Sequence, residues 1–197
     1  MPSTTEPAPG VIKDASNPCR DRREVPLPDG QIVWIRSVEL TDDAPLQTFF
    51  SQISPNDLRL RFFSKVSPWD PSLSADLAQI RKKGAVAWLA LDDRAHDIWG
   101  IGQLHPEPTG STAEFAVLIR SDMKGRGIGW VLLNHILDCA STMGIDVVAG
   151  QVLQENTTML AMCREFGFTA EPLDVASHVE AVRIHTKPSE NKLPTHR

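Results

Sequence analysis

The sequence predicts a mixed α/β domain in which helices flank a central, twisted mixed sheet. Two observations predict this class. The 197-residue chain is 41% apolar, enough for a chain of this length to bury a core without disulfide support. Along the chain, segments with the two-residue period of strands alternate with segments that have the 3.6-residue period of helices.

The first half of the chain predicts one strand and then three helices. The strand follows the turn Asp29-Gly30 and shows an alternating apolar pattern. Pro55 indicates a helix start, because the N–H that proline lacks has no partner in a first helical turn. The predicted elements are a strand over 31–38, a helix capped by Asp42 or Asp43, a helix from Pro55 to Phe63, and a helix over 73–83 that ends at Gly84.

The second half predicts an antiparallel meander of three strands, followed by alternating helices and strands. Turn-forming residues separate the three strands, and the change to a helical period begins at Gly129. The predicted elements are strands over 85–91, 98–105 and 112–119, a helix over 129–144, a strand over 146–152, a helix over 157–166 and a strand over 179–184.

Both ends of the chain have a composition typical of flexible tails. Residues 1–29 hold six of the 15 prolines among polar and charged residues, and residues 187–197 are almost free of apolar side chains. The sequence therefore predicts one folded domain over residues 30–186.

Composition excludes several classes of protein. The net charge of −5 argues against a nucleic-acid partner, since phosphate-binding surfaces carry an excess of Lys and Arg. No apolar run reaches the roughly 20 residues of a membrane helix, and residues 1–10 lack the order of a signal peptide. The three cysteines show no CxxC spacing, so we expect neither a disulfide framework nor a thiolate metal site, and a cytoplasmic setting.

A glycine-rich turn lies between the strand over 112–119 and the helix that follows it. Its sequence is Lys124-Gly125-Arg126-Gly127-Ile128-Gly129. Backbone N–H groups at a helix N-terminus bind anions, and glycines let a ligand approach the backbone closely. Lys124 and Arg126 add positive charge at the mouth of this turn. The turn is therefore a candidate phosphate site, although a close-packed structural turn has the same sequence signature.

Two common phosphate motifs are excluded here. A Walker A loop requires a glycine followed by lysine, which occurs nowhere in the chain, and a dinucleotide-binding GxGxxG would need glycine where Trp130 stands. The run Lys124-x-x-Gly127-x-Gly129 instead resembles the (Gln/Arg)-x-x-Gly-x-(Gly/Ala) motif of the GNAT N-acetyltransferase family, in which acetyl-CoA places its pyrophosphate on this turn.

A second motif supports the resemblance. Asn156, the helix after it and the closing Gly167-Phe168 match the family pattern Asn-x6-Tyr-x3-Gly-Phe, with Cys163 at the tyrosine position. The segments 53–63 and 113–115 further resemble the acetyltransferase domain of bacterial protein-lysine acetyltransferases of the Pat type. The resemblance covers about residues 31–186.

The resemblance implies which residues contact acetyl-CoA. It implies that the backbone of residues 117–119 pairs with the pantetheine arm like an added strand and polarises the thioester carbonyl. Asn156 is implied as a pantetheine contact, and a helix N-cap is an equal and compatible interpretation. The implied cofactor residues are Val117, Leu118, Ile119, Lys124, Gly125, Arg126, Gly127, Ile128, Gly129, Trp130, Asn156 and Cys163.

The sequence departs from the family pattern at two positions. Lys124 replaces the usual Gln or Arg, which keeps a donor but loses planar, multidentate geometry. The chain contains no tyrosine, so the tyrosine that protonates the leaving thiolate in many family members is absent and Cys163 stands in its place. A thiol can donate a proton, but a buried cysteine on an apolar helix face is more typical of packing.

Glu114 is the candidate general base. A free lysine has a pKa near 10.4, so its ammonium must lose a proton before it can attack a thioester. Glu114 lies in an apolar strand just before the glycine turn, where partial burial would raise its pKa, and the matching glutamate is the base in Pat-type domains. The alternative is a glutamate that simply faces solvent.

The sequence thus predicts an acetyl-CoA-dependent N-acetyltransferase that acts by direct attack on a primary amine, with a protein lysine as the leading acceptor. A small amine as acceptor, and an acyl-CoA sensor without turnover, stay open as alternatives. Oligomeric state and acyl-chain preference stay open too. No metal is expected, because the histidines lack ligand spacing and suit surface or core positions; these are His96, His105, His135 and His178.

Overall fold

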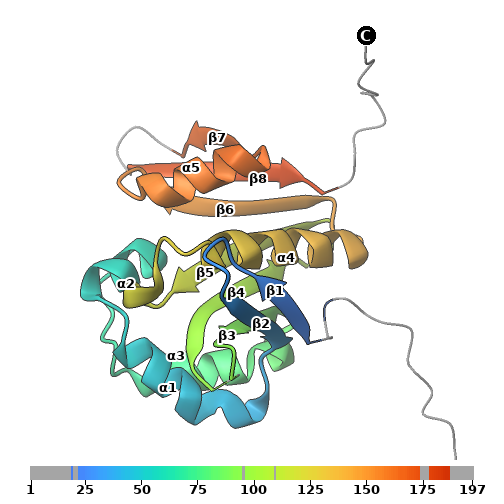
Figure 1. Ribbon diagram of the computed structural model, residues 1–197. Helices are drawn as coiled ribbons and strands as arrows, with labels where there is room; N and C mark the ends of the chain where they lie inside the picture. Colours follow the sequence, from blue (N-terminus) through green and yellow to red (C-terminus); the bar gives the residue numbers. More distant parts are fainter. Residues whose placement is uncertain (1–18, 20–21, 95, 109, 174–177, 187–197) are drawn as a thin grey trace, which may run out of the picture.

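Eight strands form one sheet in the order β1-β2-β3-β4-β5-β6-β8-β7 (Figure 1). The computed structural model describes residues 19, 22–94, 96–108, 110–173 and 178–186. All neighbouring strands are antiparallel except β5 and β6, which are parallel. The strands are β1 (Arg23–Pro26), β2 (Ile32–Ser37), β3 (Val86–Leu91), β4 (Ile98–Pro106), β5 (Thr112–Ile119), β6 (Val147–Leu153), β7 (Thr169–Pro172) and β8 (Val179–His185).

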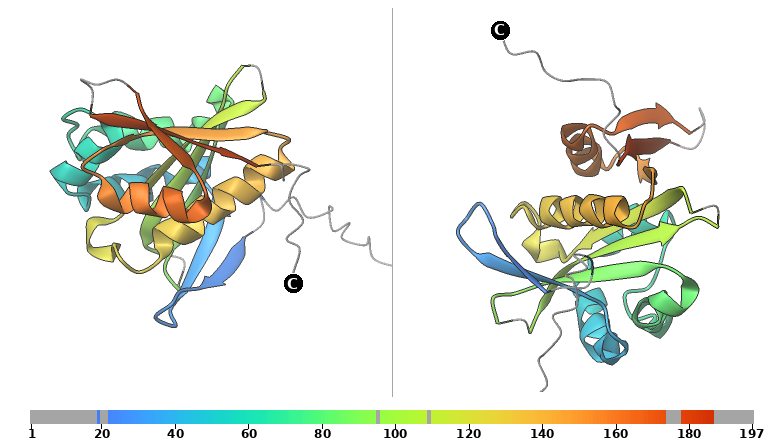
Figure 2. Two further views of the ribbon diagram at one scale, coloured as in Figure 1. Left: turned by 90° about the horizontal axis from the view of Figure 1, so that it is seen from above. Right: turned by 90° about the vertical axis from the view of Figure 1, so that its right-hand side faces the viewer.

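Helices cover both faces of this sheet. They are α1 (Asp43–Ser51), α2 (Pro55–Phe62), α3 (Pro71–Ala78), α4 (Ile128–Thr142) and α5 (Thr157–Phe166). Figure 2 shows α4 on one face of the sheet and α1 on the other. The mixed α/β class and the antiparallel meander of β3, β4 and β5 that the sequence predicts are confirmed.

Alternation along the strands divides the core into two clusters. In β4, Leu104 points to the cluster beneath α4, whereas Ile101 points to the cluster beneath α1 and α3. Leu132 and Ile136 of α4 are fully buried against the first face, and Leu46 and Phe49 of α1 against the second. Because β5 contributes to both clusters, the strand that carries the candidate site is held from both sides.

The predicted N-terminal tail of residues 1–29 is too long at its C-terminal end. Residues 23–26 form β1, which pairs with β2, and Leu27 is buried. Cys19 is buried as well, and its carbonyl oxygen accepts a hydrogen bond from Trp88 Nε1 at 2.7 Å. The proline-rich composition of this segment is typical of a flexible tail, and it does not reveal a strand that forms only by pairing with β2. Residues 1–18 and the predicted tail over 187–197 lie outside the described residues.

Asp42 does not cap α1 through its side chain. It precedes the helix, but its carboxylate accepts two hydrogen bonds from Arg36, each 2.7 Å long, and one from the backbone N–H of Glu39. A bidentate guanidinium pair is stronger than a neutral cap, so Asp42 ties the start of α1 to β2 instead. By contrast, Ser54 caps α2 as Pro55 predicts, accepting from the N–H of Asp57 at 3.1 Å.

Candidate active site

The parallel strands β5 and β6 separate after three residue pairs. Glu114 and Ala149 are the last residues that face each other in register, although β5 continues to Ile119 and β6 to Leu153. Among the described residues, no strand pairs with the edge of residues 115–119 that faces β6. This strand fork leaves backbone N–H and C=O groups free to pair with a ligand in extended conformation.

A cleft of about 900 Å³ opens from the strand fork. Residues of α2, β5, the β5–α4 loop, the start of α4, the end of β6 and α5 line it. Val117, Leu118 and Ile119 are among the lining residues, at the positions where the sequence places the cofactor's arm. In Figure 1 the β5–α4 loop, in yellow, lies beside α2 at the left of the molecule.

The glycine-rich turn closes one end of this cleft. Gly125, Gly127, Ile128 and Gly129 line it, and α4 begins at Ile128, so the first N–H groups of the helix lie at the cleft. Gly127 has a φ of +89° and Pro28 lies against it, at 3.1 Å from the position a Cβ would take. A side chain at residue 127 would be strained, which explains the requirement for glycine there.

The two cations predicted at the mouth of the turn are both engaged by the protein. Lys124 lines the cleft but forms an ion pair with Asp57 of α2, and Arg126 Nη1 donates to Gln31 Oε1 at 3.1 Å. Arg126 is absent from the cleft lining. The turn therefore offers mainly backbone N–H groups to an anion, and its lysine is shared with α2.

Asp57 joins α2 to the β5–α4 loop. Its carboxylate accepts from Lys124 and from Ser121 Oγ at 2.6 Å, and Ser121 Oγ in turn accepts from the N–H of Ser54 at 2.7 Å. Burial alone would raise the pKa of Asp57, but the hydrogen bonds from Lys124 and the two serines outweigh it and hold the pKa below its ordinary value. Asp57 is therefore a charged carboxylate that fixes the loop.

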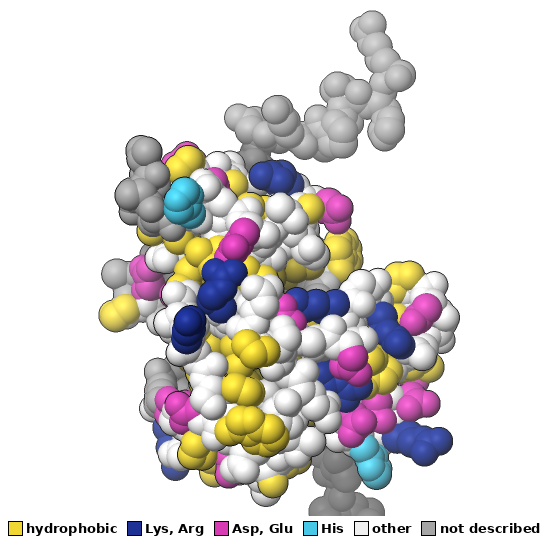
Figure 3. All heavy atoms as spheres, turned by 90° about the vertical axis from the view of Figure 1, so that its left-hand side faces the viewer, with side chains coloured by type: hydrophobic (Ala, Val, Ile, Leu, Met, Phe, Trp, Pro, Cys, Tyr) yellow, Lys and Arg dark blue, Asp and Glu magenta, His cyan; other side chains and the backbone are white. Residues whose placement is uncertain are grey.

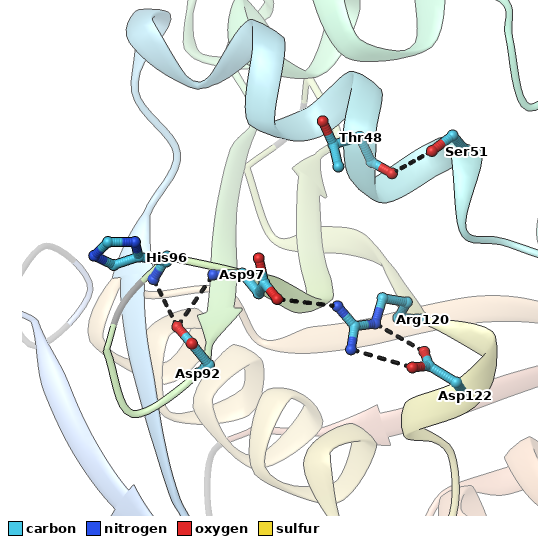
Figure 4. Close-up of polar contacts among 7 residues, drawn as sticks. All are labelled: Thr48, Ser51, Asp92, His96, Asp97, Arg120 and Asp122. Atoms are coloured by element: carbon cyan, nitrogen blue, oxygen red, sulfur yellow. Dashed lines mark hydrogen bonds and ion pairs between the residues drawn. The ribbon is translucent and has the colours of Figure 1, made fainter.

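Arg120 anchors the same loop to the β3–β4 turn. Figure 4 shows its guanidinium between Asp97, in the β3–β4 turn, and Asp122, in the loop. Arg120 Nε lies 2.8 Å from Asp122 Oδ1, and Nη1 lies 3.7 Å from Asp97 Oδ2. Asp92 orders the turn itself by accepting the N–H groups of His96 and Asp97. These contacts position the backbone that leads into the glycine-rich turn.

Glu114 lines the cleft at the strand fork, but the partial burial that the sequence predicts for it is wrong. Its side chain is exposed. It points to the face of the sheet opposite α4, because its neighbours Ala113 and Phe115 pack into the cluster beneath α4. A carboxylate there is accessible from the cleft.

Three polar side chains lie on the same side of the sheet as Glu114 and contact one another. His105 is its cross-strand partner in β4, and Gln103 Oε1 lies 2.9 Å from His105 Nε2 and 3.3 Å from Arg61 Nη2. Partial desolvation by the surrounding side chains, reinforced by the charge of Arg61, lowers the pKa of His105, and the charge of Glu114 opposes this shift. The His105 side chain keeps access to solvent, one of the two environments, surface or core, that the sequence allows for it.

The second family motif forms the far wall of the cleft. Asn156 lines it and also caps α5, since its Oδ1 accepts from the N–H of Met159 at 3.2 Å, so the capping interpretation is confirmed. Trp130 lines the cleft from α4, is 48% exposed, and stacks on Phe166 of α5 with ring centroids 4.5 Å apart. That stack joins the two helices that flank the cleft.

Cys163 is buried away from the cleft. It is 1% exposed, packs in the cluster beneath α4, and is absent from the cleft lining although Met162 beside it is present. Burial raises the pKa of the Cys163 thiol to about 11. The implied cofactor contact is not found, because the shorter side chain at this helix position ends in the core.

The described residues show neither a metal-binding cluster nor a helix suited to span a membrane. They hold no cluster of three or more His, Cys, Asp or Glu side chains suited to a metal ion. His135 is a core residue, edge-on to Trp88 with centroids 5.1 Å apart, and burial lowers its pKa to about 4. Within the same residues, none of the helices has the length and apolar composition that crossing a bilayer requires.

The face on which α2 lies carries side chains of every kind. Figure 3 shows Lys and Arg, Asp and Glu, and hydrophobic side chains intermixed on this face. Sequence reasoning assigned no role there to Asp57 or Arg61, although both lie in the segment 53–63 that carries the resemblance. Helical periodicity could not reveal them, since their partners Lys124 and Gln103 are distant in sequence.

Comparisons with known proteins agree on one family. Residues 54–168 match the acetyltransferase (GNAT) family. An acetyltransferase of Pseudomonas aeruginosa, PA5475, is 27% identical over 148 residues, which are 74% of this chain and 79% of the relative.

Solved structures share the fold at lower identity. The GNAT domain of S. lividans PAT has a TM-score of 0.71 and 23% identity, covering 83% of this chain and 96% of that domain. Spermidine N-acetyltransferase of Vibrio cholerae, solved with CoA and spermine, has a TM-score of 0.63 and 18% identity, covering 78% and 95%. With the strand fork, the glycine-rich turn and the family match together, this chain belongs to the acetyltransferase (GNAT) family, with acetyl-CoA as its co-substrate.

Proposed function

We propose that this acetyltransferase moves an acetyl group from acetyl-CoA to the side-chain amine of a protein lysine, with Glu114 as general base. The observation that carries this proposal is the place of Glu114: it is the last paired residue of β5, at the point where the unpaired edge of that strand begins. The resemblance of segments 53–63 and 113–115 to the acetyltransferase domain of Pat-type protein-lysine acetyltransferases supports a protein acceptor.

The cleft suits acetyl-CoA bound in an extended conformation. Its pyrophosphate lies against the N–H groups at the start of α4, and its pantetheine arm pairs with the free edge of residues 117–119. The thioester then lies near the strand fork, where a backbone N–H of β5 polarises the carbonyl group.

Transfer proceeds by direct attack. Glu114 accepts a proton from the lysine ammonium, and the neutral amine attacks the thioester carbonyl carbon. The tetrahedral intermediate collapses as the carbon–sulfur bond breaks, and the CoA thiolate leaves. The attached nitrogen loses its second proton to water to give the amide, and Glu114 releases the first proton to solvent. Water protonates the thiolate, since the chain has no tyrosine and the thiol of Cys163 is buried.

A panel of acceptors tests the proposal. The protein is incubated with acetyl-CoA and with lysine peptides, polyamines or amino acids, and CoA release is followed while mass spectrometry locates the acetyl group. Transfer to the Nε atom of lysine peptides is expected. Turnover on polyamines or amino acids without turnover on peptides would assign a small-molecule acceptor and contradict the proposal, as would the absence of turnover.

A further inference from the structure

Arg61 lines the cleft, and no carboxylate lies within ion-pair distance of its guanidinium among the described residues. Arg36, Arg59 and Arg120 each form an ion pair with a carboxylate among the described residues. Arg61 forms none: its polar contact is a hydrogen bond of 3.3 Å from Nη2 to Gln103, whose oxygen also lies close to His105. Its Nε is buried without a hydrogen-bond partner.

The surroundings of this guanidinium are partly apolar. The side chain is only half-exposed, and the guanidinium carbon lies 4.9 Å from the centroid of the Phe62 ring. Burial lowers the pKa of Arg61, and the charge of Glu114 opposes that shift. A desolvated cation with unused donors is costly for a protein unless an anion meets it in the functional state.

Arg61 and Glu114 face the same part of the cleft. Both residues line the cleft. Arg61 is hydrogen-bonded to Gln103 of β4, and Gln103 pairs with Ala116 of β5. Ala116 and Glu114 are two residues apart in β5, so their side chains lie on the same face of the sheet. Two residues along a strand span about 7 Å. A carboxylate for an ammonium group and a guanidinium for an anion thus face one region of the cleft.

We infer that Arg61 binds a carboxylate of the acceptor, so that the enzyme selects an amine with a carboxylate group a few ångströms away. This inference rests on the proposed function and specifies its acceptor. Two sources supply such a group: an Asp or Glu side chain close to the acceptor lysine in a protein, or the carboxylate of a free amino acid. A planar guanidinium suits either, because it can donate two parallel hydrogen bonds.

Matched substrates test the inference. One arm compares lysine peptides that carry Glu or the nearly isosteric Gln at each position within three residues of the lysine. The other compares amino acids with the amines left by their decarboxylation. In one arm, kcat/KM is expected to be at least about tenfold higher for the carboxylate member, since leaving a charged donor unpaired is costly. The arm that shows the difference identifies the source.

Variants of one helix assign the preference to Arg61. Arg61→Gln should abolish it, Arg61→Lys should keep part of it, and Arg59→Gln, which alters an arginine two residues earlier that is ion-paired with Glu155, should retain it. Thermal unfolding checks that each variant is folded, and the wild-type comparison needs no variant. Equal kcat/KM in both arms, or a preference that survives Arg61→Gln, overturns the inference while leaving acetyl transfer intact. Failure of the proposed function has a different readout, because no lysine peptide, with or without a neighbouring carboxylate, would then be acetylated.

Discussion

The ring of Phe115 lies directly against the backbone of Gly150, so that a Cβ at residue 150 would be 2.7 Å from Phe115 Cε1. These residues come immediately after Glu114 and Ala149, the last pair that β5 and β6 share. Phe168 packs on the same ring, with centroids 5.3 Å apart. The Phe115 ring therefore occupies the space that a side chain at residue 150 would fill, at the point where β5 and β6 separate.

Gly150→Ala should destabilise the protein by about 1–3 kcal/mol, because the rigid Phe115 ring cannot make room without moving a strand. Denaturant unfolding measures this. Gly102→Ala is the matched control in β4: its Cβ would meet the terminal Ile136 Cδ1 at 3.0 Å, and that side-chain end can adjust. An equal or larger loss of stability for Gly102→Ala would contradict the explanation of the fork.

Gly127→Ala should weaken acetyl-CoA binding by about tenfold, because a residue with a Cβ is strained at a φ of +89° and a shift of the turn misplaces the N–H groups of α4. Calorimetry measures the dissociation constant. Gly110→Ala is the control, since Gly110 has a φ of +75° in the β4–β5 turn, outside the cleft lining. If both variants bind acetyl-CoA equally, the turn does not hold the cofactor.

Asp57→Asn should cost about 1–3 kcal/mol of unfolding free energy at neutral pH, because it removes a buried carboxylate that accepts charged hydrogen bonds. The native pKa of Asp57 lies below its ordinary value, so its contribution is complete above the unfolded-state pKa of about 3.9 and is lost as the pH falls through the lower native pKa.

Urea unfolding of wild type and Asp57→Asn at a series of pH values tests this dependence. The difference in unfolding free energy should be constant above about pH 5 and shrink in more acidic solution. A difference that grows on acidification would show that the charge of Asp57 does not stabilise the loop.

Cys163→Ala should leave kcat within about threefold of wild type, because a buried thiol outside the cleft cannot protonate the CoA thiolate. Steady-state assays at saturating acetyl-CoA measure this. With its pKa raised to about 11, the thiol should also react slowly with iodoacetamide in the folded protein. A loss of about 100-fold in kcat with intact stability would return Cys163 to the mechanism.

Local pattern predicted the elements that carry the site. The bounds of β5, Thr112–Ile119, and of α5, Thr157–Phe166, agree with the prediction, because their apolar periods are complete and turn or capping residues mark their ends. The strands β1 and β7 were missed. Each has four residues and includes proline, and each is defined by pairing with a distant strand rather than by alternation.

The sequence predicted the parts of the site that are formed by the backbone of one segment. It did not predict the contacts between side chains of distant segments. Glycines before a helix indicate a turn that binds anions, and the structure has that turn at the cleft. The engagement of Lys124 by Asp57, and of Arg61 by Gln103, joins residues more than 40 positions apart. Periodicity describes neighbours within one element. It could not show that Lys124 forms an ion pair with a carboxylate whereas Arg61 contacts only a neutral amide.

The activity of Glu114→Gln tests the central claim most directly. With a lysine peptide and saturating acetyl-CoA, kcat should fall by about 10²- to 10⁴-fold while the KM for acetyl-CoA changes little, and Glu107→Gln, in the turn outside the cleft lining, should behave as wild type. A kcat for Glu114→Gln within about threefold of wild type would show that the carboxylate at the strand fork is not the base.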